Sequence, residues 1–87
     1  MALAVTDVRV ENCGSLNCRI ITGTVASGDT TGNIVTGFTG IIFAVVVGID
    51  YDMAVSALDW TTTAGTLTPT FANPGATKNF KAFVLGY

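Results

Sequence analysis

The stretch GIIFAVVVGI, residues 40–49, decides what kind of protein this sequence encodes. It contains no charged and no hydrogen-bonding side chain, and no other part of the chain is as apolar. A membrane-spanning helix needs about 20 consecutive apolar residues. The run is shorter than that, because Asp50 and Asp52 follow it and a segment with glycines and threonines precedes it. The sequence therefore predicts no membrane span here.

The residue types of this run favour a β-strand. Its interior consists of β-branched and aromatic side chains, which fit a pleated surface, and glycines bracket it. Such a continuous apolar run predicts a strand in the middle of a sheet, buried on both faces. One face would pack on the domain's own core, and the other on a second layer or on a neighbouring subunit. We therefore expect a charge at Val45 or Val46 to abolish folding, and a charge at an outward-facing position beside them to break assembly alone.

Further short strands and turns account for most of the remaining chain. Alternating apolar and polar residues or β-branched runs predict strands over residues 3–10, 19–26, 61–71 and 78–87, with 34–40 leading into the central run. Glycine, asparagine and proline predict loops or turns over residues 11–18, 27–33 and 72–77. In the last of these, Pro74 and Gly75 fit the central positions of a type II turn.

Two further segments complete the structural prediction. Pro69 indicates that segment 61–71 lies at the edge of a sheet, because proline cannot donate a ladder hydrogen bond. Segment 50–60 forms either a short helix or an irregular crossing with extended pieces, and we favour the crossing. The whole pattern predicts one all-β domain over residues 1–87, a small antiparallel β-sandwich or barrel of about six or seven strands.

The chain carries few charges for its size. Only 11% of its 87 residues are charged, against about 25% in ordinary globular proteins. The sparse charge favours a surface partly covered by other subunits over a small, Thr-coated monomer. The net charge is −2 and no basic run occurs, which argues against a nucleic-acid partner. No signal peptide is expected either, because the N-terminus has no basic start and reaches Asp7 early.

Cys13 and Cys18 flank the sequence GSLN. A hairpin between segments 3–10 and 19–26 would bring them within reach of a possible disulfide. Folding in the cytosol favours free thiols, and a disulfide formed later in an oxidising medium is the alternative. The C-x4-C spacing and the absence of histidine do not match a thiol oxidoreductase or a zinc site.

No set of residues points to catalysis. Histidine, the commonest general base and metal ligand, is absent. Asp50 and Asp52, with Asp59 nearby, could chelate a cation, but a charged exit from the buried strand is the favoured interpretation. The loop SGDTTGN (27–33) lacks the lysine of a phosphate-binding loop. We therefore predict a protein that is not an enzyme, with no catalytic residue, no metal site and no cofactor.

Aromatic residues supply the candidate contacts with a partner. Large rings are frequent anchors in protein interfaces, and core packing is their alternative role. The candidate interface residues are Tyr51, Trp60, Phe83 and Tyr87.

A longer stretch, WTTTAGTLTPTFANPGATKNFKAFVLGY (residues 60–87), combines a Thr- and Gly-rich segment with a closing apolar strand and a Gly-aromatic end. Together with the N-terminal Val-x-Val strand and the apolar central strand, this order of features resembles the small β-rich structural proteins of tailed-bacteriophage virions, above all capsid decoration (cement) proteins. The resemblance covers most of the chain in style and transfers no functional residue. It implies a non-enzymatic protein that oligomerises and binds the outer face of an icosahedral shell.

The expected function is thus that of a virion structural protein, folded in the host cytoplasm, that stabilises a capsid from outside. Its expected partners are further copies of itself, with a trimer favoured, and the major capsid protein or another virion protein; no membrane is expected. One alternative is a tail-tube, head–tail joining or fibre-base protein. Another is a carbohydrate- or surface-binding β-sandwich module that stacks glycans on Trp60 and Tyr51.

Overall fold

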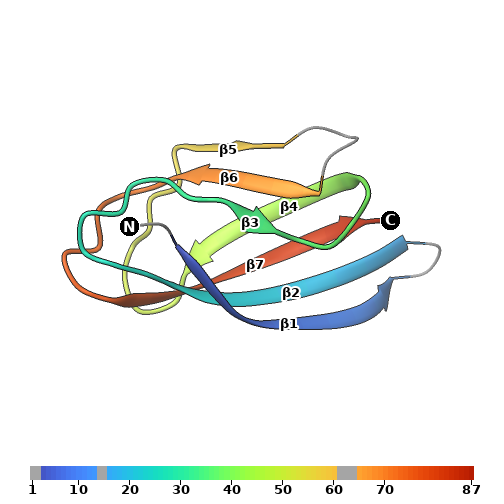
Figure 1. The fold of residues 1–87 in the computed structure, drawn as a ribbon, viewed down its shortest axis with the longest axis horizontal. Coiled ribbons are helices and arrows are strands. Elements are labelled where there is room, and N and C mark those ends of the chain that lie inside the picture. Colours follow the sequence, from blue (N-terminus) through green and yellow to red (C-terminus); the bar gives the residue numbers. More distant parts are fainter. Residues whose placement is uncertain (1–2, 14–15, 61–64) are drawn as a thin grey trace.

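The structure is a computed structural model that describes residues 3–13, 16–60 and 65–87, and of residues 12 and 13 the backbone alone. Its described part contains strands and no helix (Figure 1). The strands are β1 (Ala4–Cys13), β2 (Leu16–Val25), β3 (Ile34–Val35), β4 (Ile41–Gly48), β5 (Ala57–Asp59), β6 (Thr66–Thr70) and β7 (Lys78–Gly86). The expected all-β class is confirmed.

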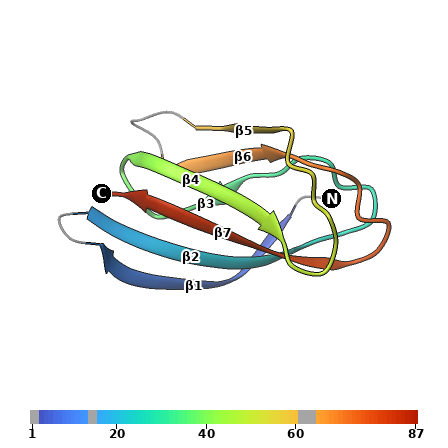
Figure 2. The same ribbon diagram turned by 180° about the vertical axis from the view of Figure 1, so that it is seen from behind.

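Two antiparallel sheets form two layers (Figures 1 and 2). The larger sheet has the strand order β1-β2-β7-β4, and the smaller has the order β3-β6-β5. The last strand, β7, lies between β2 and β4 in the larger sheet. It therefore joins the N-terminal hairpin to the apolar strand in the middle of the chain.

The core lies between the two sheets. The larger sheet supplies buried side chains from β2, β4 and β7, which alternate along each strand as period-2 burial requires. They are Ile21, Val25, Ile41, Ala44, Val46, Phe80, Ala82 and Val84. The smaller sheet and the connections add Leu3, Ile34, Phe38, Met53, Leu67 and Phe71. Gly23 lies opposite Phe80, and a Cβ at Gly23 would come within 2.5 Å of the Phe80 ring, so the glycine leaves room for the largest core side chain.

The apolar run 40–49 does form a strand, but its predicted position is wrong. β4 is an edge strand, because β7 pairs with one side of it and, among the described residues, no strand pairs with the other. Its burial alternates: Ala44 and Val46 are buried, whereas Val45 and Val47 are exposed. The second face of the strand is therefore not covered by a layer that the described residues supply.

The predicted edge position of segment 61–71 is also wrong. Its described strand, β6, is the central strand of the smaller sheet. Pro69 is accommodated because the neighbouring chain is interrupted beside it: Ile34 pairs with Leu67 and Thr31 bridges Thr70, with no pair between them. The missing N–H of Pro69 coincides with that interruption.

The connections agree in part with the sequence prediction. Segment 11–18 was expected to be a loop, but β1 continues to Cys13 and β2 begins at Leu16. Segment 50–60 crosses without a helix and ends in β5, as favoured. Gly75 has a φ of 73°, the left-handed conformation that the second central position of a type II turn requires.

Candidate functional site

The candidate site is the face of the larger sheet that points away from the core, which we call the outer face. The register between the strands places its residues in rows across β1, β2, β7 and β4. The rows are Glu11–Cys18–Leu85–Phe43, Arg9–Ile20–Phe83–Val45 and Asp7–Thr22–Lys81–Val47. Because paired residues lie on the same face of a sheet, each row is a line of neighbouring side chains.

The part of the outer face over β7 and β4 is apolar apart from Lys81, which is exposed on β7. Phe43 and Val47 are each 51% exposed and Val45 is 42% exposed, while Phe83 and Leu85 lie half-buried beside them. Ile20 on β2 extends the surface, and Ile42 and Ile49 at the two ends of β4 are half-exposed.

This apolar surface is large for a chain of this size. A half-exposed phenylalanine side chain contributes on the order of 100 Å², and a half-exposed valine or isoleucine contributes less. Together with the half-buried neighbours, the surface amounts to roughly 600 Å², the upper end of the apolar patches that monomeric proteins expose. Patches of that size usually mark a place where another molecule binds.

The other charged residues of the outer face lie at its far side, on β1. The Arg9 Nε donates to the Glu11 carboxylate at 2.8 Å, and both side chains are exposed. Such a surface pair adds little stability. An apolar centre bordered by charged residues is the usual anatomy of a protein–protein interface.

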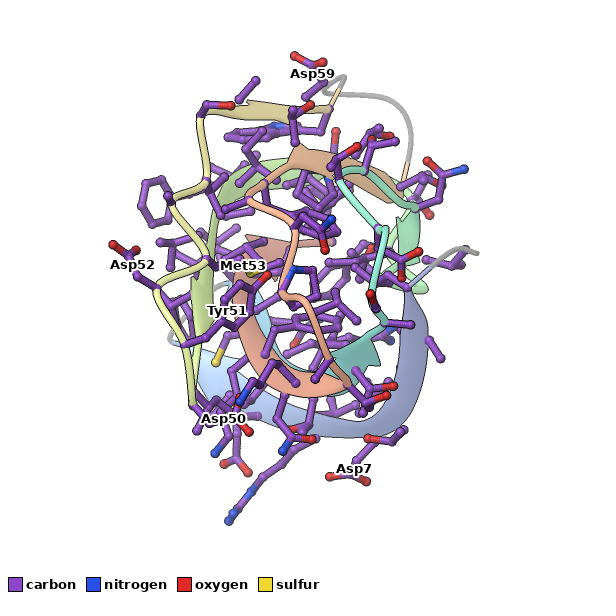
Figure 3. All side chains as sticks on the ribbon, turned by 90° about the vertical axis from the view of Figure 1, so that its left-hand side faces the viewer. Asp7, Asp50, Tyr51, Asp52, Met53 and Asp59 are labelled. Atoms are coloured by element: carbon purple, nitrogen blue, oxygen red, sulfur yellow. The ribbon has the colours of Figure 1, made fainter. Side chains whose placement is uncertain are left out.

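The three aspartates 50, 52 and 59 do not converge (Figure 3). Asp50 accepts hydrogen bonds from the backbone N–H of Asn79 at 2.8 Å and from its Nδ2 at 3.2 Å. The backbone hydrogen bond from Asn79 is the main cause that lowers the pKa of Asp50. Asp52 accepts from the N–H of Ala54, which has a positive φ of 45°. Within the described ranges, no three Asp, Glu, Cys or His residues gather as they would at a cation site.

The four predicted interface aromatics lie at separate places. Tyr51 and Trp60 are half-buried against the core, and the Tyr51 hydroxyl donates to the carbonyl of Ala72 at 3.1 Å. Burial is the main cause that raises the pKa of Tyr51, followed by Asp29 and Asp50. Phe83 is on the outer face, and Tyr87 is 57% exposed beyond the end of β7.

Cys18 is buried and disulfide-bonded, so the expectation of a free thiol is wrong for this residue. Its position on β2 pairs with Glu11, and Cys13 is two residues further along β1. The two cysteines thus belong to adjacent paired strands and not to a separate loop. Cys13 is the one other cysteine of the chain, and its side chain lies outside the described residues. Their mutual pairing stays a prediction.

Sequence reasoning missed most of the outer face. Phe43, Val45 and Val47 were expected to be buried, since both faces of the run are apolar. Two features of the sequence could have indicated it. The second face of the apolar run needs a cover that the sequence does not identify, and the chain has few charged residues. Neither distinguishes a covering layer of the same chain from a separate partner.

Comparisons with protein families, with curated proteins and with solved structures find no match for this chain. Within residues 3–13, 16–60 and 65–87, no helix is long and apolar enough to cross a membrane.

Proposed function

We propose that this chain is a non-enzymatic virion structural protein, a small β-sandwich that oligomerises and binds the outer surface of a capsid as a decoration (cement) protein. The observation that supports the proposal is the apolar outer face over β7 and β4, centred on Phe83 and Val45. Interfaces of permanent assemblies are more apolar than transient ones, and this surface has that character.

The low charge of the chain agrees with this role. With 11% charged residues, the protein has few groups to keep an isolated copy in solution. A protein that binds the assembled shell and not the loose subunits shifts the equilibrium toward the shell by mass action. Burial of the outer face across the joints between capsomers would supply the binding free energy.

The test uses capsids of the phage that encodes the chain, prepared without this protein. We expect the purified protein to bind these capsids and to raise their melting temperature. Phe83→Lys should abolish both effects, because it places a charge at the centre of the outer face. Val35→Lys is the control, because Val35 is 69% exposed on the other sheet. Absence of wild-type binding, or equal binding by Phe83→Lys, overturns the proposal.

The alternative tail-tube, head–tail joining or fibre-base role uses the same apolar face. Mass spectrometry of separated heads and tails distinguishes the two roles, because a decoration protein is recovered with the heads. The glycan-binding alternative has weaker support, since Tyr51 and Trp60 pack against the core.

A further inference from the structure

The hydrogen bonds at both ends of β7 define which backbone groups of β4 are unpaired. Ile49 N donates to Asn79 O at 3.0 Å, and Tyr87 N donates to Gly40 O at 3.1 Å. Asn79 and Tyr87 therefore direct their backbone groups toward β4. Alternate residues of a strand direct these groups to the same side, so Lys81, Phe83 and Leu85 do the same.

The partners of these residues on β4 are Val47, Val45 and Phe43, which form the hydrogen-bonded pairs. The residues between them, Ala44 and Val46, consequently direct their N–H and C=O groups away from β7, to the free edge of the sheet. In the part of the chain that the structure describes, no backbone hydrogen bond joins these two residues to another segment.

Segment 51–55 lies beside the C-terminal end of the free edge. Segment 51–55 passes beside residues 46–48 of β4, but a cavity of about 340 Å³ lies between them. Val46 lines this cavity, whereas Ala44 lies nearer the start of the strand and away from segment 51–55.

The two edges of the larger sheet differ in their protection. Natural edge strands avoid pairing with other chains by means of charges, prolines and bulges. β1 carries Asp7, Arg9 and Glu11 and has an irregular register between Val5 and Asp7. β4 carries no charge and no proline, and its irregularity lies at its start, so Phe43–Gly48 keeps a regular register.

We propose that β4 pairs edge to edge with β4 of a second copy of this chain. The pairing is antiparallel with a twofold axis at Val45, so that Ala44 of each copy exchanges hydrogen bonds with Val46 of the other. Each copy offers the same two donors and two acceptors, which makes the edge complementary to itself. The two larger sheets then form one continuous sheet.

The area of the outer face favours a second copy over a single-strand partner. One outer face offers roughly 600 Å², less than the ~800 Å² per partner that a stable interface buries. Two outer faces side by side offer roughly 1,200 Å², which exceeds that requirement. This preference for a second copy over a single-strand partner rests on the proposed function, because the area compared is the one that a capsid would cover. The unpaired donors and acceptors of β4 do not depend on that function.

Sedimentation velocity and residue-resolved amide hydrogen exchange test the pairing. The wild-type chain of 9.0 kDa should sediment as a dimer at micromolar concentration. The amides of Ala44 and Val46 should then be as protected as that of Val45, and should lose protection on dilution to the monomer. A monomeric wild type, or a dimer in which these two amides exchange rapidly, overturns the inference.

Two variants provide an independent check. Ala44→Pro removes a donor from the free edge and leaves the ladder to β7 intact, so the dissociation constant should rise roughly 30-fold or more. Val45→Lys places two like charges at the twofold axis and should also give monomers. Circular dichroism verifies that each variant is folded. A folded variant that dimerises like wild type counts against the proposed interface.

Phe83→Lys separates this inference from the proposed function. Phe83 is on the outer face but away from the free edge, so this variant should still dimerise while losing the capsid. Dimers that never bind capsids refute the capsid role alone, and capsid binding by a wild-type monomer refutes the pairing alone.

Discussion

Val45 and Val46 are adjacent in β4, and their side chains lie on opposite faces of the larger sheet. Val46 is 5% exposed and packs in the core, whereas Val45 is 42% exposed on the outer face. A charge at these two positions therefore meets different surroundings. The core offers no partner to a carboxylate, while the outer face lets it contact water.

We predict that Val46→Asp lowers the free energy of unfolding by more than about 4 kcal/mol, which a domain of this size does not tolerate. Val45→Asp should change it by less than about 1 kcal/mol. For Val45 this prediction differs from the sequence-based expectation that a charge abolishes folding, because the side chain of Val45 is exposed. Urea unfolding followed by circular dichroism measures both values, and equal losses would contradict the assigned faces.

Asp50 makes the free energy of unfolding depend on pH. Its pKa in the folded chain lies below the ordinary value of 3.8, chiefly because the backbone N–H of Asn79 donates to its carboxylate. Above that value, both the folded and the unfolded chain carry the ionised group, and its stabilising contribution is fully present. As the pH falls below 3.8, the Asp50 carboxylate is protonated first in the unfolded chain. The stabilisation is therefore lost as the pH falls through the lower pKa of the folded chain.

We therefore predict that Asp50→Asn is less stable than wild type near neutral pH, and that the two free energies of unfolding converge in acid. Urea titrations at several pH values between about 6 and 2 provide the comparison. A constant difference over this range would show that the carboxylate is not the group responsible.

Among contacts between secondary-structure elements, those of Arg19 connect the two sheets. It extends from β2 to the connection between β3 and β4, where its Nη1 donates to the carbonyl of Thr36. Its guanidinium lies 4.5 Å from the centre of the Phe38 ring, a cation–π contact. The Thr36 hydroxyl in turn donates to Gly65 O at 2.7 Å. This chain of contacts fixes the start of β4 relative to both sheets.

We predict that Arg19→Ala lowers the free energy of unfolding by about 2 kcal/mol, since it removes a charged hydrogen bond and the ring contact. Arg9→Ala is the matched control, because Arg9 is an exposed arginine in a surface ion pair and its loss should cost less than about 0.5 kcal/mol. Chemical denaturation of both variants checks the difference. Similar losses would mean that Arg19 is no more important to the fold than a surface residue.

At the scale of the whole molecule, the two edges and two faces of the larger sheet have different properties. One face covers the core and one edge is charged, whereas the other edge carries no charge and the outer face over β7 and β4 is apolar apart from Lys81. Copies joined at β4 would present one continuous apolar surface to a shell. Self-association and capsid binding would then use separate groups, the backbone of β4 for the first and outward side chains for the second.

Local sequence patterns determined the strands. The alternation in 78–87 and the β-branched run 41–47 each predicted the strand found at that place, because period-2 burial depends on a few neighbouring residues. Gly75 has the positive φ that the predicted turn requires. The absence of a helix in segment 50–60 was also favoured from sequence.

Only the tertiary structure decided which strands are neighbours. β7, from the end of the chain, lies between β2 and β4, and this distant pairing leaves the most apolar strand at an edge. The run GIIFAVVVGI is apolar on both faces, and its composition is the same whether a layer of the chain or a partner covers the second face. That cover depends on contacts between residues far apart in sequence, which local propensities do not encode. Hence the sequence determined that β4 is a strand, and the fold determined that its outer face is open.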